Sequence, residues 1–149
     1  MISNVEIEIE CLSHFKGLKL PAYQTEHSAG VDLQSAEDVT IKKGERKLVA
    51  TGIKMAIPIG YEGQIRPRSG LSLREGLLVP NSPGTIDSDY RGEVKIILWN
   101  LGENDFKINK GDRIAQLVIS PIVRAAFQVV AELGITDRNE GGFGHTGVS

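Results

Sequence analysis

The chain has 149 residues, the length of one domain and enough to bury a hydrophobic core without disulfide cross-links. Its 17 basic and 19 acidic residues leave a net charge of -2, which argues against electrostatic binding of a long nucleic acid, and 5% aromatic residues are too few for a base-stacking surface. The single Cys11 excludes an internal disulfide and a metal site built on thiolates.

Short segments with strand periodicity follow one another along the chain. Residues 5–10 alternate apolar and acidic side chains, so they form neither a signal peptide nor a membrane span, and we expect a soluble protein of the reducing cytoplasm. The one helix predicted covers residues 69–76, from Ser69 to Gly76. Such a series of short strands predicts an all-β sandwich or barrel. The further strands are expected at residues 29–36, 39–41, 45–51, 54–57, 61–67, 77–79, 93–101, 106–108, 113–120 and 124–132.

Two turns have matching sequences, residues 41–46 (IKKGER) and 108–113 (INKGDR). Glycine at the fourth place suits a left-handed backbone, so we expect two hairpins. Shared turn chemistry and a structural duplication both explain the match. Residues 96–99 (IILW) are apolar on both faces, which predicts a strand buried on both sides, either at the centre of the domain or at an oligomer interface.

From Gly134 onward the chain is polar and rich in glycine. Such a composition buries too little apolar surface to order itself, so these residues taken alone predict a disordered tail. We therefore divide the chain into a β domain, residues 1–133, and a C-terminal tail, residues 134–149.

Several segments carry side chains that suit a phosphorylated ligand and its metal. Residues 66–71 (RPRSGL) place two arginines and a serine where a strand meets a helical turn, and both arginines and helix starts bind phosphate. Arg138 and the glycines of the tail add a guanidinium and backbone N–H groups. Asp32 and Asp87 supply the carboxylate oxygens that Mg²⁺ and an attacking water need. The chain has no P-loop motif.

Each of these residues also has an ordinary structural interpretation. Asp87 fits a turn aspartate and Asn81 a turn asparagine, because both residue types hydrogen-bond their own backbone in turns. Asp32 fits a salt bridge at a strand end, and Tyr90 fits a packed aromatic. The residues alone leave both interpretations open.

In order and spacing, five segments resemble the five motifs of the dUTPase family (deoxyuridine triphosphate nucleotidohydrolases). They are residues 29–33 (AGVDL), 67–71 (PRSGL), 84–92 (GTIDSDYRG), 111–117 (GDRIAQL) and 138–147 (RNEGGFGHTG). The resemblance implies a jelly roll, or distorted β-barrel, with one short helix. It also implies a homotrimer with shared active sites that hydrolyses dUTP to dUMP and pyrophosphate with Mg²⁺. Such an enzyme keeps dUTP low and supplies dUMP for thymidylate synthesis, and its tail closes over the active site of a neighbouring subunit.

The resemblance assigns roles to single residues. Asp87 would orient and deprotonate the water that attacks the α-phosphorus, and Asp32 would hold hydrated Mg²⁺ through its waters. The ring of Tyr90 would pack under the deoxyribose and leave no room for a 2′-hydroxyl. Asn81 would read uracil, and Phe143 would stack on it. The implied substrate-binding set is Arg68, Ser69, Gly70, Asn81, Gly84, Tyr90, Gln116, Arg138, Phe143 and Gly144.

The tail departs from the family pattern at two positions. The family has serine where this chain has His145, and an imidazole N–H in that place would make closure depend on pH. Asn139 replaces a glycine, and asparagine tolerates a left-handed backbone better than most residues. Two rival functions use the same fold: a dCTP deaminase or bifunctional deaminase–dUTPase, and a non-catalytic nucleotide sensor.

Overall fold

The computed structural model describes residues 4–142, and it is built from short β-strands with one α-helix of seven residues and a 3-10 turn. The all-β class with a single short helix is therefore confirmed. Within residues 4–142, no helix has the length and apolar character needed to cross a bilayer. The elements are β1 (Glu8–Cys11), η1 (Ser13–Phe15), β2 (Val31–Gln34), β3 (Val39–Ile41), β4 (Arg46–Ala50), β5 (Ile53–Ala56), β6 (Tyr61–Arg66), α1 (Ser69–Glu75), β7 (Leu77–Leu78), β8 (Gly84–Ile86), β9 (Lys95–Asn100), β10 (Phe106–Ile108) and β11 (Arg113–Pro121).

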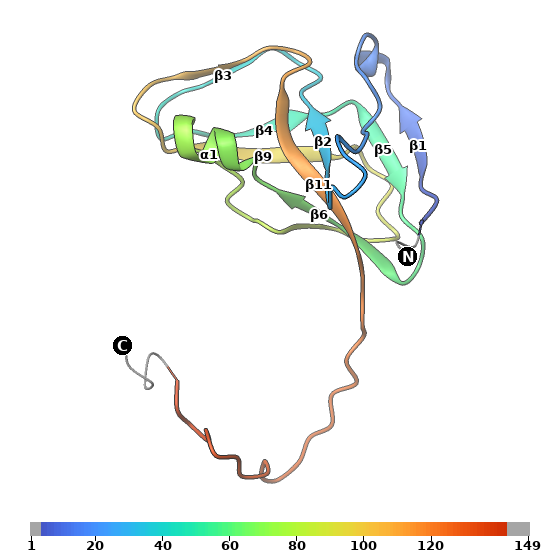
Figure 1. Ribbon diagram of the computed structural model, residues 1–149, viewed down its shortest axis with the longest axis vertical. Coiled ribbons are helices and arrows are strands. Elements are labelled where there is room, and N and C mark those ends of the chain that lie inside the picture. The colour runs from blue at the N-terminus through green and yellow to red at the C-terminus, as the bar shows by residue number, and fades with distance from the viewer. Residues whose placement is uncertain (1–3, 143–149) are drawn as a thin grey trace.

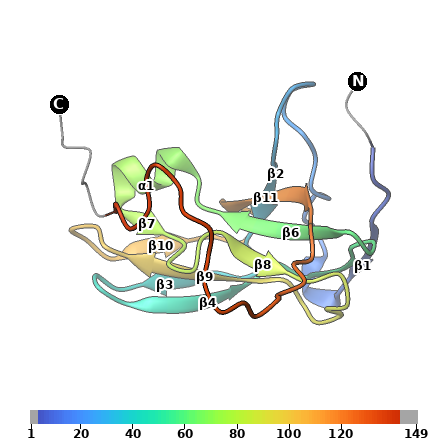
Figure 2. The ribbon, with the colours of Figure 1, turned by 90° about the horizontal axis from the view of Figure 1, so that it is seen from below.

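A long antiparallel ribbon organises these strands into a jelly roll. β2, β3 and β4 pair in turn with β11, β10 and β9, so two distant stretches of the chain run side by side in opposite directions. The ribbon folds over, and its ends become parts of two sheets with the orders β2-β11-β6-β8 and β4-β9-β7 (Figures 1 and 2). The hydrophobic core is contributed by both sheets.

Strand β9 buries only one of its two apolar faces within this chain. Ile96 and Leu98 are buried in the core, whereas Ile97 is 36% exposed. Leu48 of β4 is the register partner of Ile97 and is also exposed, so the two side chains form an open apolar surface. The prediction of a strand buried on both sides is therefore wrong for the single chain. The alternative of an oligomer interface stays a prediction.

The two matching turns are not hairpins. Gly44 and Gly111 are left-handed as expected, with φ of 79° and 96°. In each turn, the residue two places before the glycine donates its N–H to the carboxylate that follows the glycine, at 2.8 Å. However, the strands on either side of each turn pair with other strands: β3 pairs with β10, while β4 and β11 belong to the larger sheets. Each turn therefore carries the chain from one sheet to another: residues 41–46 lead from β3 to β4, and residues 108–113 lead from β10 to β11.

Residues 122–142, which we call the arm, extend away from the body (Figure 1). The predicted strand at residues 124–132 is wrong in this chain, because the segment has no strand assignment. A strand receives its ladder of hydrogen bonds from a neighbour, and the arm has none within the described residues. Phe127 and Val129 are 97% and 98% exposed, so the arm leaves large apolar side chains in water.

Candidate active site

A first cluster of predicted site residues lies on the sheet that contains β2, β11 and β6. Gln116 of β11 is the register partner of both Asp32 on β2 and Arg66 on β6. Directly opposed residues of antiparallel strands project from the same face of a sheet. The side chains of Asp32, Arg66 and Gln116 therefore lie on one face.

Two arginines hold the carboxylate of Asp32. Nε of Arg68 donates to its Oδ1 at 2.9 Å, and Nη1 of Arg113 donates to its Oδ2 at 3.1 Å. The Arg68 guanidinium also donates to the backbone carbonyl of Arg113 at 3.3 Å, so three of the five motif-like segments are joined here. Sequence reasoning missed the part played by Arg113, which lies inside the segment 111–117 but is 81 residues from Asp32.

Helix α1 begins directly after Arg68, so Ser69 and Gly70 follow the arginine that contacts this carboxylate. Ser69 is the first helical residue, as predicted, and Arg68 occupies the N-cap position. Gly76 ends the helix with φ of 66°, as predicted. Nε2 of Gln116 donates to the carbonyl of Pro67 at 2.9 Å, which fixes the amide next to the start of the helix. We call Asp32, Arg68, Arg113 and Gln116 the Asp32 cluster.

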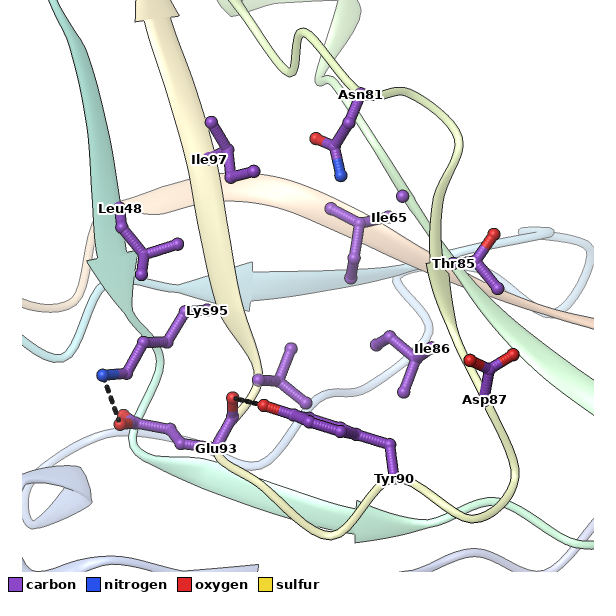
Figure 3. A pocket seen from close by; sticks show the side chains of 12 residues that line it. Leu48, Ile65, Asn81, Thr85, Ile86, Asp87, Tyr90, Glu93, Lys95 and Ile97 are labelled. Carbon is purple, nitrogen blue, oxygen red and sulfur yellow. Dashed lines mark hydrogen bonds and ion pairs between the residues drawn. The ribbon is translucent and has the colours of Figure 1, made fainter.

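A second set of predicted residues lines an open groove of about 520 Å³ (Figure 3). Asn81, Gly84, Asp87 and Tyr90 come from β8 and the loops on either side of it. A Cβ atom at Gly84 would lie 2.9 Å from Nδ2 of Asn81, so only glycine lets this amide approach the strand so closely. The rest of the lining comes largely from apolar side chains, including Leu48, Ile65, Ile86, Val94 and Ile97.

Tyr90 and Asp87 lie at the rim of the groove, on the loop that follows β8 (Figure 3). The hydroxyl of Tyr90 donates to the backbone carbonyl of Glu93 at 3.0 Å, and the ring lies against Gly92. Asp87 is exposed to solvent, as a group that meets an incoming water must be. The structure therefore brings four of the predicted residues together around one concave surface.

The Glu93 carboxylate is held by contacts from distant parts of the chain. Nε2 of His14 lies 2.6 Å from Oε1, the Gly52 N–H donates to the same oxygen at 2.9 Å, and the Lys95 ammonium lies 3.6 Å from Oε2. Burial acts to raise the pKa of Glu93, but the hydrogen bonds from His14 and Gly52 and the nearby positive charges outweigh it. The net effect is a pKa below its usual value of 4.5.

This lowered pKa of Glu93 predicts loss of stability in acid. Above pH 4.5 the carboxylate is charged in both folded and unfolded chains, so its stabilisation is fully present. As the pH falls through the lower folded pKa, the group is protonated and that stabilisation disappears. We expect the difference in melting temperature between the wild type and Glu93→Gln to be constant above about pH 5 and to shrink below pH 4.5, at fixed protein concentration.

Glu103→Gln is the matched control for this measurement. Glu103 also has a lowered pKa, through its hydrogen bond and charge pairing with Lys43, but its side chain is 88% exposed. Water screens such a pair, so its pH-dependent difference should be much smaller. An equal loss of stability at pH 4 and pH 7 for Glu93→Gln would contradict the prediction.

The Asp32 cluster and the groove lie on opposite faces of one sheet. Ile65, Leu117 and Gly84 are register partners on β6, β11 and β8, and they project from the face opposite to Arg66 and Gln116. The groove contains Ile65 and Gly84 and therefore belongs to this second face. In one chain, the two sets cannot contact the same small ligand.

The arm carries the remaining described site residue, Arg138. Its Nε donates to the carbonyl of Gly141 at 2.7 Å, in a turn where Asn139 has φ of 43°. The expectation that Asn139 accommodates a left-handed backbone is confirmed. Arg138 contacts neither the groove nor the Asp32 cluster. Phe143, Gly144 and His145 lie outside the described residues.

The residues near Asp32 suit a metal that keeps most of its own water. Within residues 4–142, no three His, Cys, Asp or Glu side chains gather closely enough to hold a metal ion directly. Each oxygen of Asp32 accepts one arginine N–H and keeps a lone pair for a water molecule. Mg²⁺ is commonly bound through one carboxylate, its waters and substrate phosphates, so the site fits it in this indirect manner.

Fold and site together define a jelly-roll protein with an arginine-bound carboxylate on one face and an apolar groove on the other. A family model described as dUTPase matches residues 16–147. The deoxyuridine 5'-triphosphate nucleotidohydrolase of Syntrophotalea carbinolica is 55% identical over 148 residues, covering 98% of this chain and 99% of the relative. That of Nautilia profundicola is 58% identical over 128 residues, covering 86% and 90%. The chain therefore belongs to the dUTPase family of enzymes.

Solved structures agree with this assignment. A mutant of the Staphylococcus bacteriophage 80alpha dUTPase with dUpNHpp has a TM-score of 0.88 and 29% identity, covering 97% of this chain and all of that chain. A mutant dUTPase from phage phi11 of S. aureus, described with a structural Mg(II) ion, has a TM-score of 0.78 and 27% identity, covering 87% of this chain and 99% of that chain. The jelly-roll expectation is thus confirmed by structures as well as by topology.

Proposed function

We propose that the protein hydrolyses dUTP to dUMP and pyrophosphate in active sites shared between three copies of the chain. The separation of the groove from the Asp32 cluster by a β-sheet carries this proposal. The groove suits a nucleoside and the Asp32 cluster suits phosphates. In an oligomer, the Asp32 cluster of one copy can lie next to the groove of another copy. Such an enzyme keeps dUTP low and supplies dUMP for thymidylate synthesis.

The groove has the size and chemistry of a nucleoside site. Its volume of about 520 Å³ lies within the usual range for small-molecule sites, and its lining is apolar with a few polar groups at the rim. The Asn81 amide offers a donor and an acceptor, which matches the alternating polar edge of uracil. The Tyr90 ring would pack against the deoxyribose, and its bond to Glu93 holds it in place.

Asp87 is the group that we expect to orient and deprotonate the attacking water. It lies on the rim of the same groove and is exposed. A nucleoside in the groove would place its α-phosphate at this rim. A carboxylate at that point accepts the proton of a water aligned with the α-phosphorus, so cleavage leaves dUMP and pyrophosphate.

The Asp32 cluster of another copy would receive the phosphates. Arg68 provides charge-assisted N–H groups, and the Ser69 hydroxyl is exposed beside it. Gly70 and Gln116 would complete the contacts, with Arg138 at the γ-phosphate. Bound Mg²⁺ would neutralise phosphate charge as a Lewis acid. Asp32, fixed by its two arginines, would hold the waters of that ion.

The arm gives the physical reason for assembly. Its apolar residues alternate with mainly polar ones, as in a strand with one buried face: Ala125, Phe127, Val129, Ala131 and Leu133 share one side. These side chains are exposed in the single chain, and exposed apolar segments of this kind mark interaction surfaces. We propose that residues 122–133 pack on a neighbouring copy and that the tail, residues 134–149, closes over that neighbour's active site.

Mixed trimers test whether the sites are shared. Asp32→Asn and Asp87→Asn each change a single charge and keep the side-chain shape, and each should be nearly inactive alone. If subunits of the two variants are mixed randomly in equal amounts, about three quarters of the trimers contain both variants. Each of these mixed trimers holds one intact site out of three. The mixture should therefore regain about a quarter of the wild-type activity. Activity that stays at the level of the single variants would show that each site lies within one chain.

Pyrophosphate release measured with dUTP, dCTP, dTTP and UTP in the presence of Mg²⁺ tests the reaction itself. We expect rapid release from dUTP only. Ammonia release from dCTP would favour the deaminase, and binding of dUTP without turnover would favour a nucleotide sensor.

The one cysteine, Cys11, is a free thiol, which suits the reducing cytoplasm that we propose as the compartment of this protein.

A further inference from the structure

A hydrogen bond between residues 79 positions apart ties the loop of Tyr90 to the start of the chain. His14 lies in η1, and its Nε2 is 2.6 Å from Oε1 of Glu93. The His14 side chain is 41% exposed, whereas that of Glu93 is 14% exposed. The carboxylate is thus enclosed, and His14 covers it from the solvent side.

Glu93 in turn determines where Tyr90 lies. Its backbone carbonyl accepts the Tyr90 hydroxyl at 3.0 Å, and its carboxylate accepts the Gly52 N–H at 2.9 Å. Gly52 is buried and left-handed, and a Cβ there would lie 3.0 Å from the backbone nitrogen of Phe15. The turn that carries His14, the turn at Gly52 and the loop of Tyr90 therefore form one linked unit.

His14 can make this bond in both of its charge states. The Nε2–H group donates to a carboxylate both in the neutral tautomer that carries this proton and in the imidazolium form. Lys95, 3.6 Å from the other carboxylate oxygen, adds a positive charge on the groove side. The lowered pKa of Glu93 means that the carboxylate remains ionised, and able to accept both N–H groups, at neutral pH.

We propose that His14 is a positioning residue for the sugar subsite: through Glu93 it fixes the Tyr90 ring, and the rejection of ribonucleotides depends on this bond. The inference rests on the proposed function, in which Tyr90 packs against deoxyribose. A Tyr90 ring whose hydroxyl is bonded to Glu93 cannot move aside to make room for a 2′-hydroxyl. Steric exclusion of one hydroxyl is effective when the excluding side chain is rigid. Removing His14 leaves Glu93 with fewer fixed contacts and lets the loop shift.

Steady-state kinetics of His14→Ala with dUTP and UTP test this inference. We expect KM for dUTP to rise while kcat changes little, because Asp87 is untouched. The ratio of kcat/KM for dUTP over UTP should fall about tenfold, the low end of what one hydrogen bond to a charged group contributes. In His14→Gln, the side-chain amide can donate in place of Nε2–H, so most of the ratio should return.

His27→Ala is the matched control, since it removes an exposed imidazole from a loop outside the groove and the Asp32 cluster. Its dUTP/UTP ratio should equal that of the wild type. Melting temperatures of all variants show that each is folded. An unchanged ratio in His14→Ala would overturn the inference, and so would a reduced ratio that His14→Gln does not restore.

A second readout separates this inference from the proposed function. The chain has only three tyrosines, so ring signals of protein labelled with ¹³C-tyrosine can be assigned with Tyr90→Phe. The Tyr90 signal should move in His14→Ala and return in His14→Gln, while those of Tyr23 and Tyr61 stay in place. A Tyr90 signal that stays in place in His14→Ala would overturn the inference, while a wild type without dUTP hydrolysis would overturn the proposed function first.

Discussion

Asp87→Asn should lower the turnover of dUTP about 10²-fold to 10⁴-fold, the contribution of a positioned general base. Asparagine has the same shape as aspartate and keeps the turn, but it cannot accept the proton of the attacking water. KM for dUTP and the affinity for the dUTP analogue dUpNHpp should therefore change little. Pyrophosphate release and calorimetric binding measure the two effects separately.

A matched control is Asp105→Asn, another exposed aspartate that lies outside the groove. Its carboxylate only accepts the N–H of Lys43 at 3.0 Å, so turnover should stay near the wild-type value. Near-normal turnover of Asp87→Asn would remove this residue from the mechanism. A large loss of dUpNHpp binding would instead give it a role in holding the nucleotide.

Two truncations should separate assembly from catalysis. A chain that ends at Gly134 keeps the apolar part of the arm and should remain a folded oligomer, but it loses Arg138 and Phe143. We expect its kcat/KM for dUTP to fall about 10²-fold to 10⁴-fold, because base stacking and a charge-assisted hydrogen bond together are worth roughly 3–6 kcal/mol.

A chain that ends at Pro121 lacks the whole arm and should be monomeric as well as inactive. Light scattering gives the oligomeric state of both truncated chains, and circular dichroism shows that each has kept its β structure. Full activity of the chain ending at Gly134 would count against a closing tail. A trimer that survives the loss of residues 122–149 would show that the arm is not the source of assembly.

Local patterns predicted most strands but not their partners. β3 and β10 were placed at their observed bounds, and α1 with its terminal Gly76 was placed to within a residue, because alternation and left-handed glycines are local properties. The hairpins at Gly44 and Gly111 were wrong because a turn sets only the direction of the chain. Which strand lies alongside depends on contacts between distant segments.

The same limit explains the arm and β9. The alternation at residues 124–132 is real, but a strand needs a partner to supply its hydrogen bonds, and the single chain offers none in its described part. For Ile97, hydrophobicity predicted burial on both sides, whereas the second side forms an open groove wall. The pattern of the arm fits the assembled protein that we propose better than it fits one chain, and the second apolar face of β9 fits the groove that we propose for a nucleoside.

The resemblance to the five motifs named the site residues, and the structure adds how they are held. The bonds from Arg113 to Asp32 and from His14 to Glu93 join residues 81 and 79 positions apart, so no local pattern could reveal them. The position of the groove and the Asp32 cluster on opposite faces of a sheet was also beyond the motifs, which give order along the chain only.

The wrapped ribbon also governs when this polypeptide can fold during its synthesis. Val31 of β2 pairs with Leu117 of β11, so the barrel cannot close until the ribosome has released almost the entire body. Pairings between such distant segments are slow to form, because the long loop between them must close before any contact can stabilise it. Until then, the apolar faces and unpaired strand edges of the nascent chain are exposed, a state that favours aggregation.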